Sequence, residues 1–104
     1  MDAQLKKGVL EVLVLSVISR QDSYGYQIVN DMSKYIETSE STLYPILKRL
    51  ESQGSISTYS IEHNGRLRKY YKIAPNGLAK IDEFLRSWPE MLNLYEYIKE
   101  GRHA

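Results

Sequence analysis

The chain has 104 residues, of which 42% are hydrophobic, so it supports one small domain with a thin core that association with a second copy would help to stabilise. Its net charge of +1 argues against a strongly basic nucleic-acid-binding protein, so only the distribution of charge is informative about partners. The sequence has no cysteine and two histidines without metal-ligand spacing, which excludes disulfides and thiol catalysis; we expect neither a metal site nor a cofactor. The longest apolar run, residues 12–15, is far shorter than the about 20 residues that span a membrane, so we expect no membrane contact and a cytoplasmic protein.

Residues 5–19 are dense in Leu, Val and Ile, which is compatible with a strand or a helix. The length of this segment, and the spacing of Lys6, Lys7 and Glu11 as one polar edge, favour a helix. A helix that is apolar nearly all round must be buried on more than one side. We therefore expect one side of this helix to pack in its own domain and the other side to pack in a partner.

A second helix is predicted over residues 24–34, after a short turn in which Asp22 or Ser23 provides the N-cap. Spacings of four, four and three residues predict a core stripe on this helix, made of Tyr24, Ile28, Met32 and Tyr35. Gly25 costs roughly 1 kcal/mol of helix propensity, so its presence indicates a close approach of the backbone to a neighbouring group.

Residues 39–54 predict a third helix with one buried face and one polar, partly basic face. The buried face comprises Leu43, Ile46, Leu47 and Leu50. The polar face comprises Ser41, Thr42, Lys48, Arg49 and Glu51. Ser39 or Ser41 can cap the start, Gly54 can end the helix in the left-handed conformation, and Pro45 should bend the first turns without ending them. Arg49 either faces outwards or forms an ion pair with Glu40 or Glu51.

After the third helix the pattern changes to alternation over residues 56–63 and 67–73, which predicts two strands. Asn64-Gly65 between them is a strong signal for a type I′ turn, so the strands should form a hairpin. An isolated hairpin is only marginally stable in water, so its Ile and Tyr face should lie on the helices. The nearly neutral chain nevertheless has a basic hairpin, since residues 66–72 contain no acid and four cations, Arg66, Arg68, Lys69 and Lys72.

The last predicted element is a long helix over residues 75–100. Steps of three and four residues in alternation, the a and d register of a coiled coil, relate Leu78, Ile81, Leu85, Trp88, Leu92 and Tyr95. A second stripe widens the apolar surface beyond what one partner helix covers, and consists of Phe84, Met91, Leu94 and Ile98. Pro89 is expected to kink or divide this helix, because proline lacks an N–H donor and clashes with the preceding turn.

Three helices, a basic hairpin and a long amphipathic helix predict a mainly α fold with a small β-hairpin, the winged helix-turn-helix. In this fold the third helix enters the major groove of DNA, and the hairpin, or wing, lies along the phosphates. We expect residues 1–74 to form the DNA-binding domain and residues 75–104 to form a C-terminal dimerisation helix.

The sequence resembles the PadR family of transcriptional regulators in four places spread over nearly the whole chain. These are Tyr24-Gly25-Tyr26; Thr42-Leu43-Tyr44-Pro45 with Leu47 and Arg49-Leu50-Glu51; Gly54 before Ile56; and Arg68-Lys69-Tyr70-Tyr71. The sequence also has a Trp in the last helix, Trp88, and in this it resembles the smaller PadR subgroup that contains multidrug-binding repressors.

The resemblance implies a homodimer, joined through the first and last helices, that binds a pseudo-palindromic operator in double-stranded DNA as a repressor. It implies that Ser41, Thr42, Tyr44 and Lys48 face the DNA from the third helix, and that Arg66, Arg68 and Lys69 serve the wing. The dimer interface is expected along Leu78, Ile81, Leu85, Trp88, Leu92 and Tyr95. A small planar aromatic effector is a further hypothesis, with Trp88, Phe84, Met91 and Tyr95 around it, although Trp88 is also interpreted as a dimer-core residue.

The main alternative is a winged helix that binds another protein through the last helix and never contacts DNA. We expect no enzyme, because the sequence contains no combination of nucleophile, base and orienting group and no phosphate-binding loop. The tyrosines are interpreted mainly as packing residues, in particular Tyr24, Tyr35, Tyr70 and Tyr71, and Tyr44 stays open between packing and DNA contact.

Overall fold

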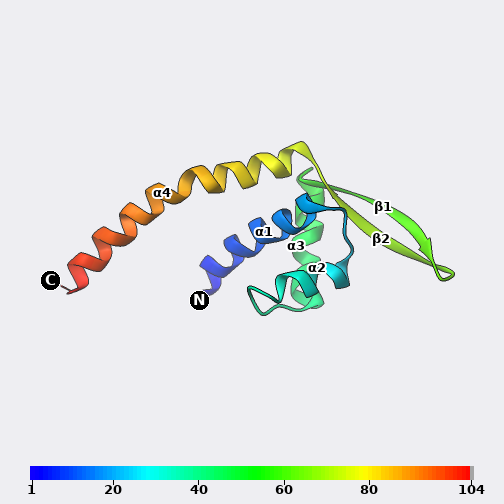
Figure 1. Cartoon of the computed structure of the whole chain (residues 1–104), viewed down its shortest axis with the longest axis horizontal. Helices are drawn as coiled ribbons and strands as arrows, with labels where there is room; N and C mark the ends of the chain where they lie inside the picture. The colour runs from blue at the N-terminus through cyan, green and yellow to red at the C-terminus, as the bar shows by residue number, and fades with distance from the viewer. Residues whose placement is uncertain (104) are drawn as a thin grey trace.

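The computed structural model describes residues 1–103, which form helices around a core and one two-stranded antiparallel sheet. The elements in chain order are α1 (Ala3–Arg20), α2 (Gly25–Met32), α3 (Glu40–Ser52), β1 (Ile56–His63), β2 (Arg66–Ile73) and α4 (Pro75–His103). In Figure 1, α1, α2 and α3 gather together, the β1–β2 hairpin projects to one side and α4 runs out in the opposite direction. The molecule is therefore elongated, measuring 63 × 26 × 20 Å. This arrangement confirms the expected mainly α fold with a hairpin and a long last helix.

One hydrophobic core joins α1, α2 and α3 to the root of the hairpin. Its buried side chains are Leu10, Val14, Leu15, Ile18, Ile28, Met32, Leu43, Ile46, Leu47, Leu50, Ile56 and Tyr71. The stripe predicted for α3 is buried as expected, but the stripe predicted for α2 is only half right. Tyr35 is 78% exposed and Tyr24 is half-buried outside this core. The reason is that α2 ends at Met32, so Tyr35 no longer follows the helical spacing.

The two sides of α1 have different surroundings. Leu10, Val14, Leu15 and Ile18 are buried in the core, whereas Leu5 is 54% exposed on the same helix. The expectation that one side of α1 packs in its own domain is therefore confirmed. Although α1 is rich in apolar residues, none of the helices in residues 1–103 has the length and apolarity needed to cross a membrane.

The start of α2 differs from the prediction, because Ser23 is not its N-cap. Ser23 is extended and exchanges two backbone hydrogen bonds with Tyr71 of β2, at 3.1 and 2.7 Å between N and O. The N-cap is Tyr24, whose side chain makes no capping hydrogen bond. Residue 23 is thus a one-residue extension of the sheet beside β2, a pairing between positions far apart in the chain.

Both ends of α3 are formed by the residues that the sequence marks. The Ser39 hydroxyl accepts a hydrogen bond from the backbone N–H of Thr42, and Gly54 adopts a φ of +74° just after the helix. Pro45 lies inside the helix, which continues to Ser52. The prediction that Pro45 does not end α3 is confirmed.

The hairpin turns at Asn64 and Gly65, whose φ angles of 51° and 79° are those of a type I′ turn. At its root Ile56 and Tyr71 are buried, and they pair with the half-buried Ile73 and Thr58. Its outer half projects beyond the helices (Figure 1), so Ile61 is 49% exposed and Leu67 is 77% exposed. The expectation that the apolar face lies on the helices therefore holds for the root alone.

Helix α4 runs through Pro89 without a break, so of the two expected effects of this residue, a kink or a division, the division is excluded. A proline removes one backbone hydrogen bond, and the turns on either side maintain the helix; the ribbon curves along its length in Figure 1. The first turn is fixed to the α3–β1 junction by Asn76, whose side-chain amide donates to the Gln53 carbonyl at 2.9 Å. Ala104, the last residue of the expected dimerisation helix, lies outside the described residues.

Replacing Gly77 with Ala should destabilise the protein, because the first turn of α4 lies directly on this junction. A Cβ atom at Gly77 would be 2.3 Å from the backbone oxygen of Ser55 and 2.6 Å from Cδ1 of Ile73. A backbone oxygen cannot rotate away, so α4 must shift, and overpacking of this kind costs about 1–3 kcal/mol. Urea unfolding at fixed protein concentration measures the change in the free energy of unfolding.

The matched control is Gly101→Ala, at a helical position where a Cβ atom meets nothing within 4 Å. This variant should be as stable as the wild type or slightly more stable, because Ala has the higher helix propensity. Equal free energies of unfolding for Gly77→Ala and the wild type would show that α4 does not pack on Ser55 as described.

Candidate nucleic-acid interface

The first turns of α3 present polar side chains to solvent. Ser41, Thr42 and Lys48 are all exposed. The Ser39 hydroxyl lies 3.0 Å from Ser41 Oγ and donates to Thr42 Oγ1 at 3.2 Å, so the hydroxyls form one small network at the helix start. Of the five residues predicted for the polar face, these three leave hydroxyls and an ammonium group able to bond to the edges of bases or to phosphates.

Tyr44 lies at the boundary between α3 and α2. Its hydroxyl is 2.7 Å from the position that a Cβ atom at Gly25 would occupy, which confirms the close approach predicted at this glycine. The same hydroxyl donates to Glu40 Oε2 at 3.4 Å, and the ring is 47% exposed. Burial raises the pKa of the Tyr44 phenol, and the Glu40 carboxylate raises it further, so the phenol stays a hydrogen-bond donor at neutral pH. Tyr44 thus packs against Gly25 of α2 and at the same time exposes part of its side chain to solvent.

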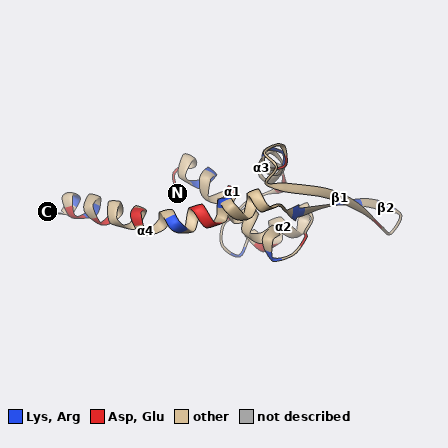
Figure 2. Ribbon diagram, turned by 90° about the horizontal axis from the view of Figure 1, so that it is seen from above, with Lys and Arg blue, Asp and Glu red and all other residues tan. Residues whose placement is uncertain are grey.

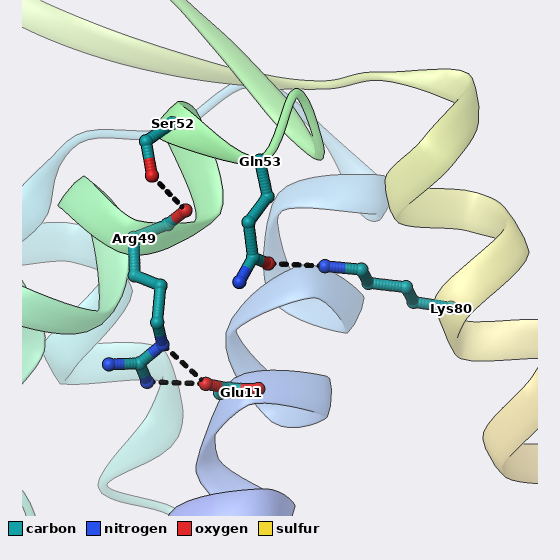
Figure 3. A network of polar contacts seen from close by, with 5 residues as sticks. All are labelled: Glu11, Arg49, Ser52, Gln53 and Lys80. Carbon is teal, nitrogen blue, oxygen red and sulfur yellow. Dashed lines mark hydrogen bonds and ion pairs between the residues drawn. The ribbon is translucent and has the colours of Figure 1, made fainter.

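Arg49 of α3 is bound to α1. Its Nε atom donates to Glu11 Oε1 of α1 at 2.7 Å, and a second guanidinium nitrogen bonds to the same oxygen. Figure 3 shows this pair between α3 and α1, beside a contact from Lys80 of α4 to Gln53. An intramolecular ion pair was one of the two interpretations for Arg49, but the partner is Glu11 rather than Glu40 or Glu51. Arg49 therefore holds α3 against α1.

The cations of the hairpin differ in whether they contact other side chains of the chain. Arg66 is exposed beside the turn. The guanidinium carbon of Arg68 lies 4.1 Å from the centre of the Tyr24 ring, in a cation–π contact. Lys69 Nζ is 3.7 Å from Glu51 Oε1 and remains 53% exposed. In contrast, Figure 2 shows Lys and Arg interleaved with Asp and Glu along α4.

A cleft of about 440 Å³ lies where α2, α3 and β2 meet. Its lining consists of Tyr24, Gly25, Tyr26, Glu40, Tyr44, Arg68, Lys69 and Tyr71. The structure therefore brings Tyr44 of α3 together with Arg68 and Lys69 of the wing, as expected for one continuous surface. Tyr26, which is 67% exposed, and Glu40 are additional members that the periodicity argument did not select. Tyr26 lies in the first turn of α2 and Glu40 in the first turn of α3, and both line this cleft.

A second concave surface lies between α1 and α4. This groove of about 460 Å³ is mostly apolar and is lined by Gln4, Leu5, Gly8, Val9, Val12, Lys80, Glu83, Phe84, Ser87, Trp88 and Met91. The rings of Phe84 and Trp88 are 5.5 Å apart between centroids. Three of the four residues expected around an effector thus share one groove, whereas Tyr95 lies outside it.

The residues expected in a dimer interface are largely solvent-exposed in the single chain. Leu85 is 61% exposed, Tyr95 57% and Trp88 45%. Ile81 is different, because it is half-buried and packs against the core of its own chain. The apolar side of α4 is therefore uncovered from Leu85 onwards.

The chain is similar to one known protein family and to several solved structures. Residues 14–83 match the model of the transcriptional regulator PadR-like family. The chain belongs to this family. A PadR family transcriptional regulator from Eggerthella lenta has 33% sequence identity and a TM-score of 0.84, over 93% of this chain and 87% of that chain. The structure of smu.1704 from Streptococcus mutans is 41% identical with a TM-score of 0.76, over 91% of this chain and 90% of that chain.

The fold of the PadR family is also present in PadR of Bacillus subtilis, whose structure was determined in complex with operator DNA. That structure matches with a TM-score of 0.69 at 22% identity, over 74% of this chain and 46% of that chain. At this identity the likeness shows the fold, and it confirms the winged helix-turn-helix architecture. The PadR-like family is one of transcriptional regulators.

The contact between Arg49 and Glu11 should contribute to stability through a measurable coupling. A double-mutant cycle of Arg49→Ala and Glu11→Ala, followed by urea unfolding, should give a coupling of about 0.5–1 kcal/mol at low salt. The coupling should shrink in 1 M NaCl, because salt screens partly exposed charges. Both side chains are about one-third exposed, at 33% and 31%.

The pair Lys69 and Glu51 provides the matched comparison, since it is longer and more exposed at 53% and 39%. Its coupling should be smaller than that of Arg49 and Glu11. The assignment of Arg49 as the residue that holds α3 on α1 is wrong if the first cycle gives no coupling at either salt concentration.

Proposed function

We propose that this PadR-family protein is a dimeric, sequence-specific DNA-binding repressor that recognises a pseudo-palindromic operator. The observation that carries the proposal is the position of the exposed polar face of α3 beside a projecting basic hairpin. The shared fold with Bacillus subtilis PadR, determined in complex with operator DNA, supports it. A regulator of this kind acts in the cytoplasm, where the DNA is.

In this proposal α3 reads the base sequence. Ser41, Thr42 and Lys48 face the major groove, where hydroxyls bond to several base edges and an ammonium group donates to guanine O6 and N7. Tyr44 contributes its exposed edge at the flank of the groove, with the phenol protonated. The buried stripe on α3 supports these assignments, because its burial leaves Ser41, Thr42 and Lys48 exposed to solvent.

The wing contributes affinity without reading sequence. Arg66, Arg68 and Lys69 lie near phosphates, and each contact releases condensed counterions, which makes the binding depend on salt. Arg66 is the cation of this set that no other side chain is seen to engage within the described residues. It is therefore the clearest position for a test of the phosphate contacts.

We further propose that residues 1–74 bind DNA and that residues 75–104 join two copies. The uncovered apolar side of α4 supports this division, together with the exposed Leu5 side of α1, which shares a groove with α4. Leu78, Leu85, Trp88, Leu92 and Tyr95 would become buried between the copies, and Ile81 would connect the interface to each core. A two-fold dimer presents two copies of α3 to half-sites about 34 Å apart.

The groove between α1 and α4 would hold a small planar aromatic effector, as in the multidrug-binding PadR subgroup. Phe84, Trp88 and Met91 provide its apolar and aromatic surface. Tyr95, which lies outside this groove in the single chain, would line the site in the dimer. Such a ligand would shift the dimer between two geometries only as far as its affinities for the two geometries differ. The distance between the two α3 helices would differ between these two dimer geometries.

The DNA-binding proposal is tested by fluorescence anisotropy with a labelled fragment from upstream of the protein's own gene. The protein should bind this fragment more tightly than a scrambled duplex, and the affinity should fall as salt rises. Arg66→Ala should reduce the slope of log K against log salt by about 1, because one phosphate contact is lost. Ser41→Ala with Thr42→Ala should instead reduce the preference for the native fragment.

Arg102→Ala is the control for the wing variant, because it removes the same charge from the last turn of α4, at the opposite end of the molecule from the hairpin. It should leave the salt slope unchanged. Weak binding that is equal for both duplexes, in a protein that forms a heterodimer with another protein, would favour the protein-interaction alternative.

Binding of an effector should quench the fluorescence of Trp88, which is the single tryptophan of the chain. A titration with planar aromatic cations should show saturable quenching, and sedimentation equilibrium should show a dimer throughout. Phe84→Ala should weaken the quenching, because this ring lies 5.5 Å from that of Trp88. An intact dimer that shows no quenching across planar dyes and drugs would contradict the effector proposal.

A further inference from the structure

The hairpin depends on a second segment of chain for its orientation. Two strands alone are only marginally stable, and the outer half of this hairpin has no helix beneath it. The segment that leads from α1 into α2 runs beside the root of the hairpin (Figure 1), where Ser23 pairs with Tyr71 through two backbone hydrogen bonds. These two bonds fix the position of the root but leave the angle of the projecting part to side chains.

Side chains from the same segment continue the contact outwards along the hairpin. The Tyr24 ring meets the Tyr70 ring edge-on, with centroids 5.5 Å apart and an interplanar angle of 70°. Tyr70 in turn stacks on Tyr59 of β1, at 5.5 Å and 10°. The Tyr59 hydroxyl then donates to Asp22 Oδ2 at 2.6 Å. The contacts therefore form a closed circuit that leaves the segment at Tyr24 and returns to it at Asp22.

Arg68 is held by the same ring. Its guanidinium carbon lies 4.1 Å from the Tyr24 centroid, on a strand position two pairs further from the root than Tyr70. A guanidinium stacked on an aromatic ring keeps its N–H groups at the edge available for hydrogen bonds. Arg68 also lines the cleft shared with Tyr44 of α3, so its position relates the wing to the polar face of that helix.

We propose that Tyr24 is a positioning residue, whose ring fixes the angle of the wing to α3 and presents the Arg68 guanidinium to a phosphate of the operator. The proposal rests on the proposed DNA-binding function. It differs from a packing role in the core, because Tyr24 is half-buried and does not belong to the buried core cluster. Loss of the ring should release the hairpin while the helices remain folded.

The first test uses the full-length protein without DNA, so that it does not depend on the proposed function. Hydrogen exchange should be faster at the amides of residues 59–70 in Tyr24→Ala than in the wild type, by about tenfold, given the usual strength of an aromatic pair with a cation–π contact. Exchange at the core of α3 should stay unchanged. Tyr24→Phe should restore protection, since it keeps the ring, and Tyr35→Ala removes a 78% exposed tyrosine as the matched control.

The second test measures DNA binding of the same variants and of Arg68→Ala. Tyr24→Ala should weaken binding to the native fragment about tenfold, and Arg68→Ala should cost much less in the Tyr24→Ala background than in the wild type. Full rescue by Tyr24→Phe would support the role of the ring. A loss in Tyr24→Phe equal to that in Tyr24→Ala would overturn it in favour of a direct hydroxyl contact with DNA.

The two tests separate the possible failures. If hydrogen exchange in the hairpin is the same in Tyr24→Ala and the wild type, the positioning role is wrong whatever the protein binds. If the exchange results are as expected but the wild type binds native and scrambled duplexes equally, the proposed function fails while the structural role of Tyr24 stands. Additive effects of Tyr24→Ala and Arg68→Ala on DNA binding would overturn the presentation of Arg68 by Tyr24.

Discussion

The structure depends on the burial of one face of α3. Leu43, Leu47 and Leu50 are at most 1% exposed and Ile46 is 6% exposed, and burial of each such side chain contributes about 1.5–3 kcal/mol. Rotation of the helix about its axis would bring Thr42 or Lys48 into this core, where an unpaired polar group costs several kcal/mol. The same packing that folds the domain therefore determines which side chains α3 presents to solvent.

Most of the fold could be predicted from the sequence, because local signals and tertiary packing agree over most of the chain. The stripe on α3, the caps at Ser39 and Gly54 and the type I′ turn all depend on residues close together in sequence. At Ser23 the prediction fails because a distant partner decides: serine is a residue type that favours helix caps, but Ser23 pairs with Tyr71. At Pro89 the reason is local, because the turns on either side continue the helix through this residue.

The candidate site was less predictable, since its side-chain partners come from other elements. The basic character of the hairpin is visible in the sequence, but the stacking of Arg68 on Tyr24 connects positions in different elements. An ion pair is one of two interpretations that the sequence allows for Arg49, and the partner that forms it, Glu11, lies 38 positions away in the chain rather than at Glu40 or Glu51. Periodicity identifies which residues share a face; it does not identify what that face contacts.

The close packing of Gly77 against Ser55 determines how a movement of α4 is passed to the rest of the protein. With Gly77 against Ser55, Asn76 bonded to Gln53 and Lys80 in contact with Gln53, the first turns of α4 cannot rotate separately from the end of α3. Trp88 is eleven residues beyond Gly77, which corresponds to about 16 Å along the helix. In the proposed dimer, a small tilt of α4 near Trp88 would therefore move each DNA-binding domain as one rigid body. Substitutions in the distal half of α4 could adapt the protein to operators of different half-site spacing while the surface that reads the bases stays the same.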